Sequence, residues 1–421
     1  MHAVPAYNRD RGPRRFDLLM PPPTVFDGAN VPRYRPAMDS SFRRYAAFYF
    51  CYYAALGAYT PYIGRWVDAL GHGGYVIGGM LGLWYGSRIV GPPLWNHLVQ
   101  RSAHPGHWFV AGSVLTTLSF AAFMLTGSAV QLLAVMALFG LCYNAMMPQF
   151  EAMTLSALGT RSGNYGRIRL WGSVGFLLVA ASYGGLLDRL GSTAFPMITL
   201  PLFLLMILAA WPHRDDRPVR HVDDTQDAGH LWKRPGVRRF LMVALLMQVG
   251  FGAFYVFYTL HMQAHGHSGA AIGMLWGLGV AVEIAMFWQV PRLIERYGAP
   301  ALISVCVAAT VLRWLLTALL ADSLLLMACA QLLHALGFAV FHACCMRQMT
   351  EFFPGRRAAA GQSLLYGFSS GLGGVLGALL ASLMWDLDGG RGAFLASALA
   401  ATIAWCLYAF RARTAASTQP A

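Results

Sequence analysis

Charged residues are scarce in this chain: Asp, Glu, Lys and Arg make up 12% of its 421 residues, against about 25% in soluble globular domains. Hydrophobic residues make up 57% of it. Long polar stretches are also few, and the apolar part contains only one, at 213–239. A soluble protein of this length could not bury so much apolar surface. A lipid bilayer must therefore cover most of the chain.

Signatures of several other protein classes are missing too. The seven cysteines all fall inside apolar runs without CxxC spacing, so we expect neither a metal site nor redox chemistry. The chain has no GxxxxGK[ST] motif, which argues against ATP as an energy source by that route. Acids, bases and metal ligands form no convincing cluster at one membrane face, so we expect no enzyme and no cofactor. Residues 1–42 lack the apolar core of a signal peptide, and their Arg and Pro content predicts a disordered cytoplasmic tail.

Apolar runs long enough to cross a bilayer, which takes roughly 20 residues, recur along the chain. They are rich in Ala, Gly, Leu and Met and lack the alternation of barrel strands, which favours helices. Twelve runs qualify, at about 43–66, 75–97, 107–127, 130–156, 167–188, 194–212, 240–262, 270–291, 300–320, 323–349, 361–385 and 392–410. The sequence therefore predicts an all-α membrane protein with twelve transmembrane helices.

The formal net charge of +13 could indicate a nucleic-acid ligand, but the positions of the charges indicate membrane topology instead. With a cytoplasmic N-terminus, 25 of the 31 Lys and Arg residues fall in cytoplasmic segments, and the opposite side holds only Arg65, Arg189 and Arg391. This is the positive-inside pattern. We therefore expect a multi-pass protein of the cell inner membrane, with both termini cytoplasmic, surrounded by the lipid bilayer and without a nucleic-acid partner.

An internal repeat relates the two ends of the chain. A shift of 195 residues places 57–59 on 252–254, and 171–172 on 366–367. Six spans per copy give both copies the same orientation, as in parallel transporter repeats. The predicted organisation is an N-terminal six-helix bundle at 43–212, a cytoplasmic linker at 213–239, a C-terminal six-helix bundle at 240–410 and a cytoplasmic tail at 411–421.

Charged side chains at membrane depth cost at least about 2.5–3.5 kcal/mol each on insertion scales, so each requires a reason. Arg88 and Glu283 both lie about eleven residues into their spans, and the shift of 195 residues relates them. The repeat axis would place them at equal depth on opposite sides of a central cavity. We expect Arg88 to bind an anionic substrate group and Glu283 to carry a proton. Local hydrogen bonds that only hold helices together are the alternative.

Three further polar residues lie in the tenth predicted span. His334 and His342, eight residues apart, share one broad helix face, and Arg347 follows five residues later. The two histidines could relay protons or bond a substrate carboxylate. Histidines packed against a backbone carbonyl are the alternative.

Two more charged residues lie in predicted spans, and the sequence alone does not decide the role of either. Glu151, near the cytoplasmic end of the fourth span, is either an intracellular gate or second proton site, or a carboxylate that pairs with Arg169. Arg313 lies in the ninth span, and its role depends on where that helix stands in the bundle.

Four stretches carry a family resemblance: YGRIRLWGS at 165–173, GMLWGLGVAVEI at 273–284, VLRWL at 311–315 and LLHALGFAVFHACCMRQ at 332–348. Over about 43 to 410 the chain resembles the major facilitator superfamily, and within it the 3-phenylpropionate permease group, relatives of lactose permease and nucleoside:proton symporters. The resemblance implies alternating access around a site between the two bundles. It also implies substrate contacts at Arg88, His334, His342 and Arg347, and proton coupling at Glu283 and Glu151. The major facilitator arrangement makes the ninth helix peripheral, so for Arg313 it implies a structural or snorkelling role rather than substrate contact.

Together these observations predict a secondary active transporter, active as a monomer, that imports a small organic solute with protons. An aromatic carboxylate is the expected substrate, because Arg88 could steer an anion and tyrosines are frequent in the first span. A sugar or nucleoside proton symporter and an efflux antiporter are the alternatives. An integral-membrane enzyme is the alternative from another class.

Overall fold

Helices make up nearly all regular structure in the computed structural model, which describes residues 40–159, 164–216 and 229–416. No strand occurs in these three ranges. We call residues 40–216 the first half and residues 229–416 the second half. The first half contains α1 (Ser40–Ala69), α2 (Gly74–Gln100), α3 (Pro105–Ala121), α4 (Ala129–Leu158), α5 (Tyr165–Leu190) and α6 (Phe195–Ala210).

The second half has longer helical stretches that are interrupted inside. Its helices are α7 (Pro235–Gly250), α8 (Gly252–Ala264), α9 (Gly269–Tyr297), α10 (Ala299–Leu319), α11 (Leu324–Ala335), α12 (Phe341–Phe352), α13 (Ala358–Leu365) and α14 (Gly374–Ala416). Two π-helical segments, η6 (Leu336–Val340) and η8 (Tyr366–Gly373), join α11 to α12 and α13 to α14. Within α14 the backbone leaves helical geometry at Asp388 and Gly389, so two helices meet there at a kink.

Nine helical segments within the described ranges are long and apolar enough to cross a membrane. The last of these, Gly355–Ala409, contains the kink at Asp388 and Gly389 and so spans two helices. α1 and α2 do not reach the same apolarity, and α1 contains Arg43, Arg44 and Arg65. The all-helical membrane character predicted from composition is therefore confirmed.

Helix starts recur at the interval of the sequence repeat. α7 begins 195 residues after α1, α9 begins 195 after α2, and α11 begins 195 after α4. The caps repeat as well, because Ser128 and Ser323 each accept a hydrogen bond from the backbone N–H three residues ahead. The duplicated sequence thus starts equivalent helices at equivalent places.

The predicted domain boundaries fall partly outside the described residues. The predicted tail at 1–42 includes 1–39, the linker at 213–239 includes 217–228, and the tail at 411–421 includes 417–421, none of which is described. Inside the described ranges, α1 begins at Ser40 and α7 at Pro235, and α14 continues to Ala416.

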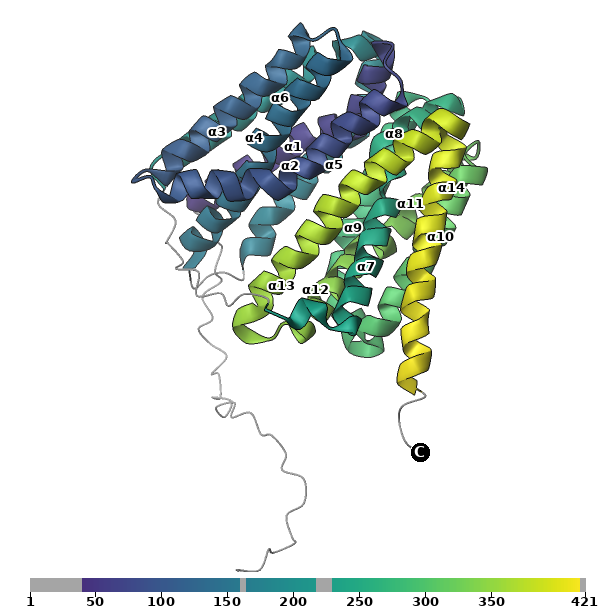
Figure 1. Cartoon of the computed structure of the whole chain (residues 1–421). Helices are drawn as coiled ribbons and strands as arrows, with labels where there is room; N and C mark the ends of the chain where they lie inside the picture. The colour runs from purple at the N-terminus through teal and green to yellow at the C-terminus, as the bar shows by residue number, and fades with distance from the viewer. Residues whose placement is uncertain (1–39, 160–163, 217–228, 417–421) are drawn as a thin grey trace, which may run out of the picture. The chain divides into compact units, whose positions relative to one another are not determined.

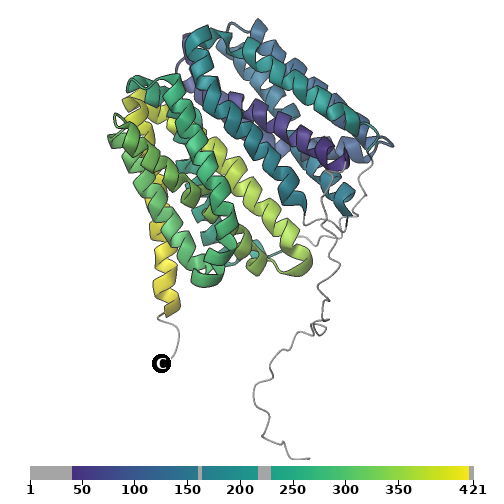
Figure 2. The ribbon, with the colours of Figure 1, turned by 180° about the vertical axis from the view of Figure 1, so that it is seen from behind.

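Each half packs mainly by contacts among its own helices, as the two views in Figures 1 and 2 illustrate. In the first half, α1 packs against α5 and α6, and α4 packs against α2 and α3. In the second half, α14 packs against α7, α8 and α10, and α9 packs against α11. The halves meet where α5 contacts α9, α14 contacts α2 and α1 contacts α8.

A hydrogen-bonded cluster fastens the start of α1 to the chain after α6. The Asp216 carboxylate accepts hydrogen bonds from Arg44 at 3.0 Å and from Tyr45 at 2.7 Å, and lies 2.8 Å from the ring of the buried His213. Burial alone would raise the pKa of Asp216, but the hydrogen bonds from His213 and Tyr45 and the charge of Arg44 hold this pKa below its usual value. The ionised carboxylate thus anchors α1 beside the end of the first half.

Two glycines bring the halves into close contact where α5 meets α9. A Cβ atom on Gly184 in α5 would overlap the backbone carbonyl of Gly269 in α9, and a Cβ on Gly269 would overlap the carbonyl of Gly184. Beside them, Arg65 and Asp188 form an ion pair at 2.9 Å. Asp188 also accepts a hydrogen bond from the Ala270 amide at 3.3 Å. Only residues without side chains allow α5 and α9 to meet this closely.

A leucine at position 184 should therefore oppose this arrangement of the halves. Overpacking typically costs about 1–3 kcal/mol, which shifts a two-state equilibrium by roughly 5- to 150-fold. We expect Gly184→Leu to reduce the initial rate of substrate uptake by at least about tenfold while the purified protein stays folded. The matched control is Gly166→Leu in the first turn of α5, where a Cβ meets open space. If Gly184→Leu and Gly166→Leu took up substrate at the same initial rate, the contact between Gly184 and Gly269 would have no part in transport.

Candidate functional site

Glu283 and His334 form the clearest pair of titratable groups deep in the second half. Glu283 Oε2 in α9 lies 3.5 Å from His334 Nε2 at the end of α11, slightly beyond an ordinary hydrogen bond. The Glu283 side chain is 19% exposed and that of His334 is 7% exposed. The imidazole stacks on Phe338 and contacts Phe254. A single proton can therefore sit between a nearly buried acid and a nearly buried base.

Arg313 lies behind this pair rather than at a helix end. It is 1% exposed, donates a hydrogen bond to Gln331 at 3.3 Å, and its guanidinium carbon lies 4.2 Å from the ring centre of Phe254. Gln331 precedes His334 by one helical turn on α11. Of the structural and snorkelling roles expected for Arg313, the structure supports the structural one, because aromatic faces bury its charge inside the second half. The hydrogen bond to Gln331 links α10 to α11, the helix that also carries His334.

The first half contributes an arginine over tyrosine rings. The guanidinium carbon of Arg169 in α5 lies 4.0 Å from the ring centre of Tyr53 and 5.6 Å from that of Tyr49. Glu151 in α4 accepts a hydrogen bond from Tyr165 at 3.3 Å and interacts electrostatically with Arg169. Gly172, one turn after Arg169, makes room for this stack, because a Cβ there would lie 2.7 Å from the Tyr53 ring. Stacking leaves the edges of a guanidinium available to an anion.

Arg88 lies on α2 and is held by neighbours from its own half. Its Nε donates a long hydrogen bond of 3.4 Å to Asn144 in α4, and its guanidinium carbon lies 5.0 Å from the centre of the Tyr85 ring. Asn144 in turn donates to Ser87 at 2.8 Å. Arg88 remains exposed. Among the described residues Arg88 therefore contacts its own half and forms no ion pair with Glu283.

Three tyrosines relate the charged groups of the two halves to one another. Tyr53 of the first half lies near Glu283, and in the second half Tyr255 lies near Arg88 and Tyr366 lies near Glu151. Arg169 of the first half also lies near Glu283, without forming an ion pair with it. We call the region bounded by Tyr53, Arg88, Glu151, Arg169, Tyr255, Glu283, His334 and Tyr366 the central site.

The predicted residues of the tenth span separate in the structure. His342 lies in α12, where its Nε2 is 3.3 Å from the Tyr366 hydroxyl, and thus borders the central site. Arg347, one turn and a half further on, is exposed and forms an ion pair with Glu351 at 3.2 Å. His334 and His342 lie on either side of the π-helical segment η6, and Tyr366 begins the segment η8. Such π-helical interruptions often occur at functional sites.

Comparison with known proteins agrees with this architecture. The model of the MFS_1-like family matches residues 42–396. The chain belongs to this family. The resemblance to the major facilitator superfamily is thereby confirmed, and the protein is a membrane transporter.

Relatives of this MFS_1-like protein differ in the solutes that they are named for. A "Probable 3-phenylpropionic acid transporter" of Escherichia coli (strain K12) is 29% identical over 306 residues, which cover 71% of this chain and 79% of the relative. The maltose permease of Geobacillus stearothermophilus is 27% identical over 272 residues, or 64% of this chain and 68% of the permease. The crystal structure of the nucleoside transporter NupG superposes with a TM-score of 0.75 at 16% identity, covering 89% of this chain and 98% of that one.

Sequence reasoning did not assign several residues of the central site in this MFS_1-like protein. Arg169 stands in the stretch at 165–173, but the sequence suggested it only as a partner for Glu151, although it lies in the first turns of α5. Tyr255 and Tyr366 gave no signal that distinguished them from packing residues. Gln331 did give such a signal, because a polar side chain in an apolar run, one turn before His334, requires a hydrogen-bond partner.

Proposed function

We propose that this transporter is a proton symporter that imports a small organic anion, such as an aromatic carboxylate, by alternating access. The observation that carries the proposal is the Glu283–His334 pair, nearly buried and 3.5 Å apart beside the central site. A carboxylate in such surroundings changes charge readily when water or substrate enters. Proton binding at Glu283 would then be coupled to occupation of the site by the substrate.

The anionic substrate class is supported by the wall opposite Glu283. Arg169 and Arg88 present guanidinium groups next to Tyr53 and Tyr85, which suits a carboxylate attached to an aromatic ring. Glu151, which is linked to this wall through Tyr165, would serve as a second proton site or gate. His342, which lies beside Tyr366, would contact the solute from the second half. Arg347 forms an ion pair with Glu351 and would not contact the substrate. The E. coli relative named for 3-phenylpropionic acid supports the same class.

We further propose twelve spans arranged as two six-helix bundles, in a protein that functions as a monomer in the inner membrane. Adding α1 and α2, and dividing Gly355–Ala409 at its kink, extends the nine apolar segments to twelve. With cytoplasmic termini, the Gly184–Gly269 contact lies on the outer side of the membrane. The arrangement would then be closed outward, with the central site approached from the cytoplasm.

A thermal-stability screen followed by transport assays tests the proposal. Purified protein would be screened against aromatic carboxylates, sugars and nucleosides, since a ligand that binds only the folded state raises Tm. The best ligand would then be tested for uptake in right-side-out and everted vesicles. We expect stabilisation by carboxylates, and uptake that a protonophore abolishes. Uptake that a protonophore leaves unchanged would reject proton coupling.

Sugar or nucleoside symport is the second candidate. The maltose permease and the nucleoside transporter among the similar proteins favour it. Stabilisation by a sugar or nucleoside, with no response to carboxylates, would decide for it. Export from right-side-out vesicles driven by an inward proton gradient would instead identify an efflux antiporter.

A further inference from the structure

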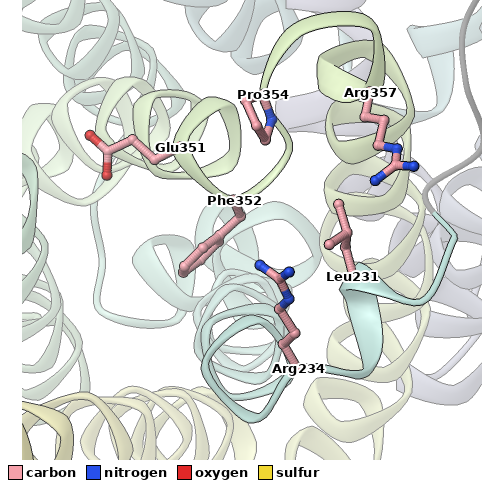
Figure 3. A pocket seen from close by; sticks show the side chains of 6 residues that line it. All are labelled: Leu231, Arg234, Glu351, Phe352, Pro354 and Arg357. Carbon is pink, nitrogen blue, oxygen red and sulfur yellow. The ribbon is translucent and has the colours of Figure 1, made fainter. Parts of the chain in front are cut away.

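A separate cavity of about 490 Å³ lies at the ends of α12 and α7. Its walls come from the turn η5 (Leu231–Lys233) with the residue after it, the end of α12, and the turn η7 (Gly355–Arg357). The lining residues, all shown in Figure 3, are Leu231, Arg234, Glu351, Phe352, Pro354 and Arg357. None of them belongs to the central site. The volume falls within the range of about 300–1,000 Å³ that small-molecule sites occupy.

Two guanidinium groups enter this cavity from opposite walls. Arg234 and Arg357 point their side chains toward the space between them (Figure 3). Within the described ranges neither forms an ion pair with an acidic side chain, and the Nε of Arg357 is buried without a hydrogen-bond partner. Two cations thus line one cavity, and neither is paired with an acidic side chain of the described residues.

The acid at the rim does not neutralise these arginines. The Glu351 carboxylate already accepts hydrogen bonds from Arg347 at 3.2 Å and from Gln348 at 3.0 Å. Figure 3 shows it turned away from Arg234 and Arg357. The first turn of α7, which begins at Pro235, adds the positive end of a helix dipole beside Arg234. Among the described residues that line the cavity, positive charge therefore exceeds negative charge, and a bound anion would balance it.

The shape and chemistry of the cavity walls indicate which kind of anion would bind there. A guanidinium fork matches the oxygens of a phosphate, and two forks can bind opposite edges of one phosphate group. Leu231, Phe352 and Pro354 supply apolar walls for whatever is attached to it. We propose that this cavity binds a phosphate oxyanion, carried either by an anionic phospholipid headgroup or by a soluble phosphate. The bound anion ties η5 and the start of α7 to the α12–α13 turn, and so stabilises this end of the second half.

The test uses the full chain in nanodiscs and measures its Tm. One arm compares phosphatidylcholine alone with phosphatidylcholine mixed with phosphatidylglycerol; the other adds inorganic phosphate to phosphatidylcholine nanodiscs, with chloride at equal ionic strength as the reference. We expect Tm to rise by roughly 2–4 °C in at least one arm. The arm that responds identifies the source of the phosphate.

The variants separate this cavity from general charge effects. Arg234→Gln with Arg357→Gln should remove the rise in Tm, whereas Arg101→Gln with Arg214→Gln, which removes the same charge from exposed sites of the first half, should keep it. A second readout is the phosphatidylglycerol or phosphate retained by the purified protein, measured by native mass spectrometry, which does not depend on stability. The proposal is overturned if the wild type shows neither a shift nor retention, or if the Arg234/Arg357 variant keeps both.

Discussion

Replacing Glu283 by glutamine is expected to abolish accumulation of the substrate against its gradient while preserving its exchange across the membrane. The amide keeps the size and most hydrogen-bonding capacity of the carboxylate but cannot take up a proton from His334 or from water. Without that proton the substrate can equilibrate but cannot be concentrated. The measurement is uptake of labelled substrate into energised vesicles, compared with counterflow in de-energised vesicles preloaded with unlabelled substrate. The expected end state is equal concentrations inside and outside.

The control for this variant removes an acid from the same helix. Glu295→Gln lies near the end of α9, where the side chain is exposed and distant from His334. It should accumulate substrate as the wild type does. Full accumulation by the Glu283→Gln variant would mean that another group carries the proton, and Glu151 would be the next residue to replace.

Removing the Arg169 guanidinium is expected to produce the largest loss of substrate affinity. In the part of the chain that the structure describes, Arg169 contacts tyrosine rings, whereas Arg88 also donates to Asn144. Arg169 therefore has more donors available for a carboxylate. A hydrogen bond to a charged group contributes about 1.5–3 kcal/mol, so Arg169→Gln should raise the substrate concentration for half-maximal uptake by roughly 10- to 150-fold.

Two further arginines serve as comparisons in the same uptake assay. Arg88→Gln should raise the half-maximal concentration less than Arg169→Gln does. Arg88 already donates a hydrogen bond to Asn144, which itself donates to Ser87, so Arg88 has fewer donors left for the substrate. Arg347→Gln should leave it unchanged, since this exposed side chain bonds to Glu351. An Arg169→Gln variant with unaltered affinity would argue for a neutral solute such as a sugar or nucleoside.

The residues of the central site were accessible from sequence to different degrees. Glu283 and His334 were both singled out, because ionisable groups in apolar runs are rare and require partners. The repeat placed Arg88 opposite Glu283, yet Arg169 of the first half also lies near Glu283. A repeat relates positions along two helices, but it does not say how far each helix is rotated about its axis or which neighbour lies nearest. Arg313 shows the same limit, since its burial against Phe254 depends on helices that are distant in sequence.

The sequence by itself determined the membrane environment, the helical class, the interval of the repeat and the family. These properties follow from composition and from local periodicity, which each segment carries independently of its neighbours. Only the tertiary structure decided which side chains come together: Glu283 lies beside His334, Arg169 stacks on Tyr53, and Arg234 and Arg357 line the same cavity. These contacts depend on how the helices pack. Apolar residues of similar size allow a helix to pack in many rotations about its axis, and a few close glycine contacts, such as Gly184 with Gly269, select one of them.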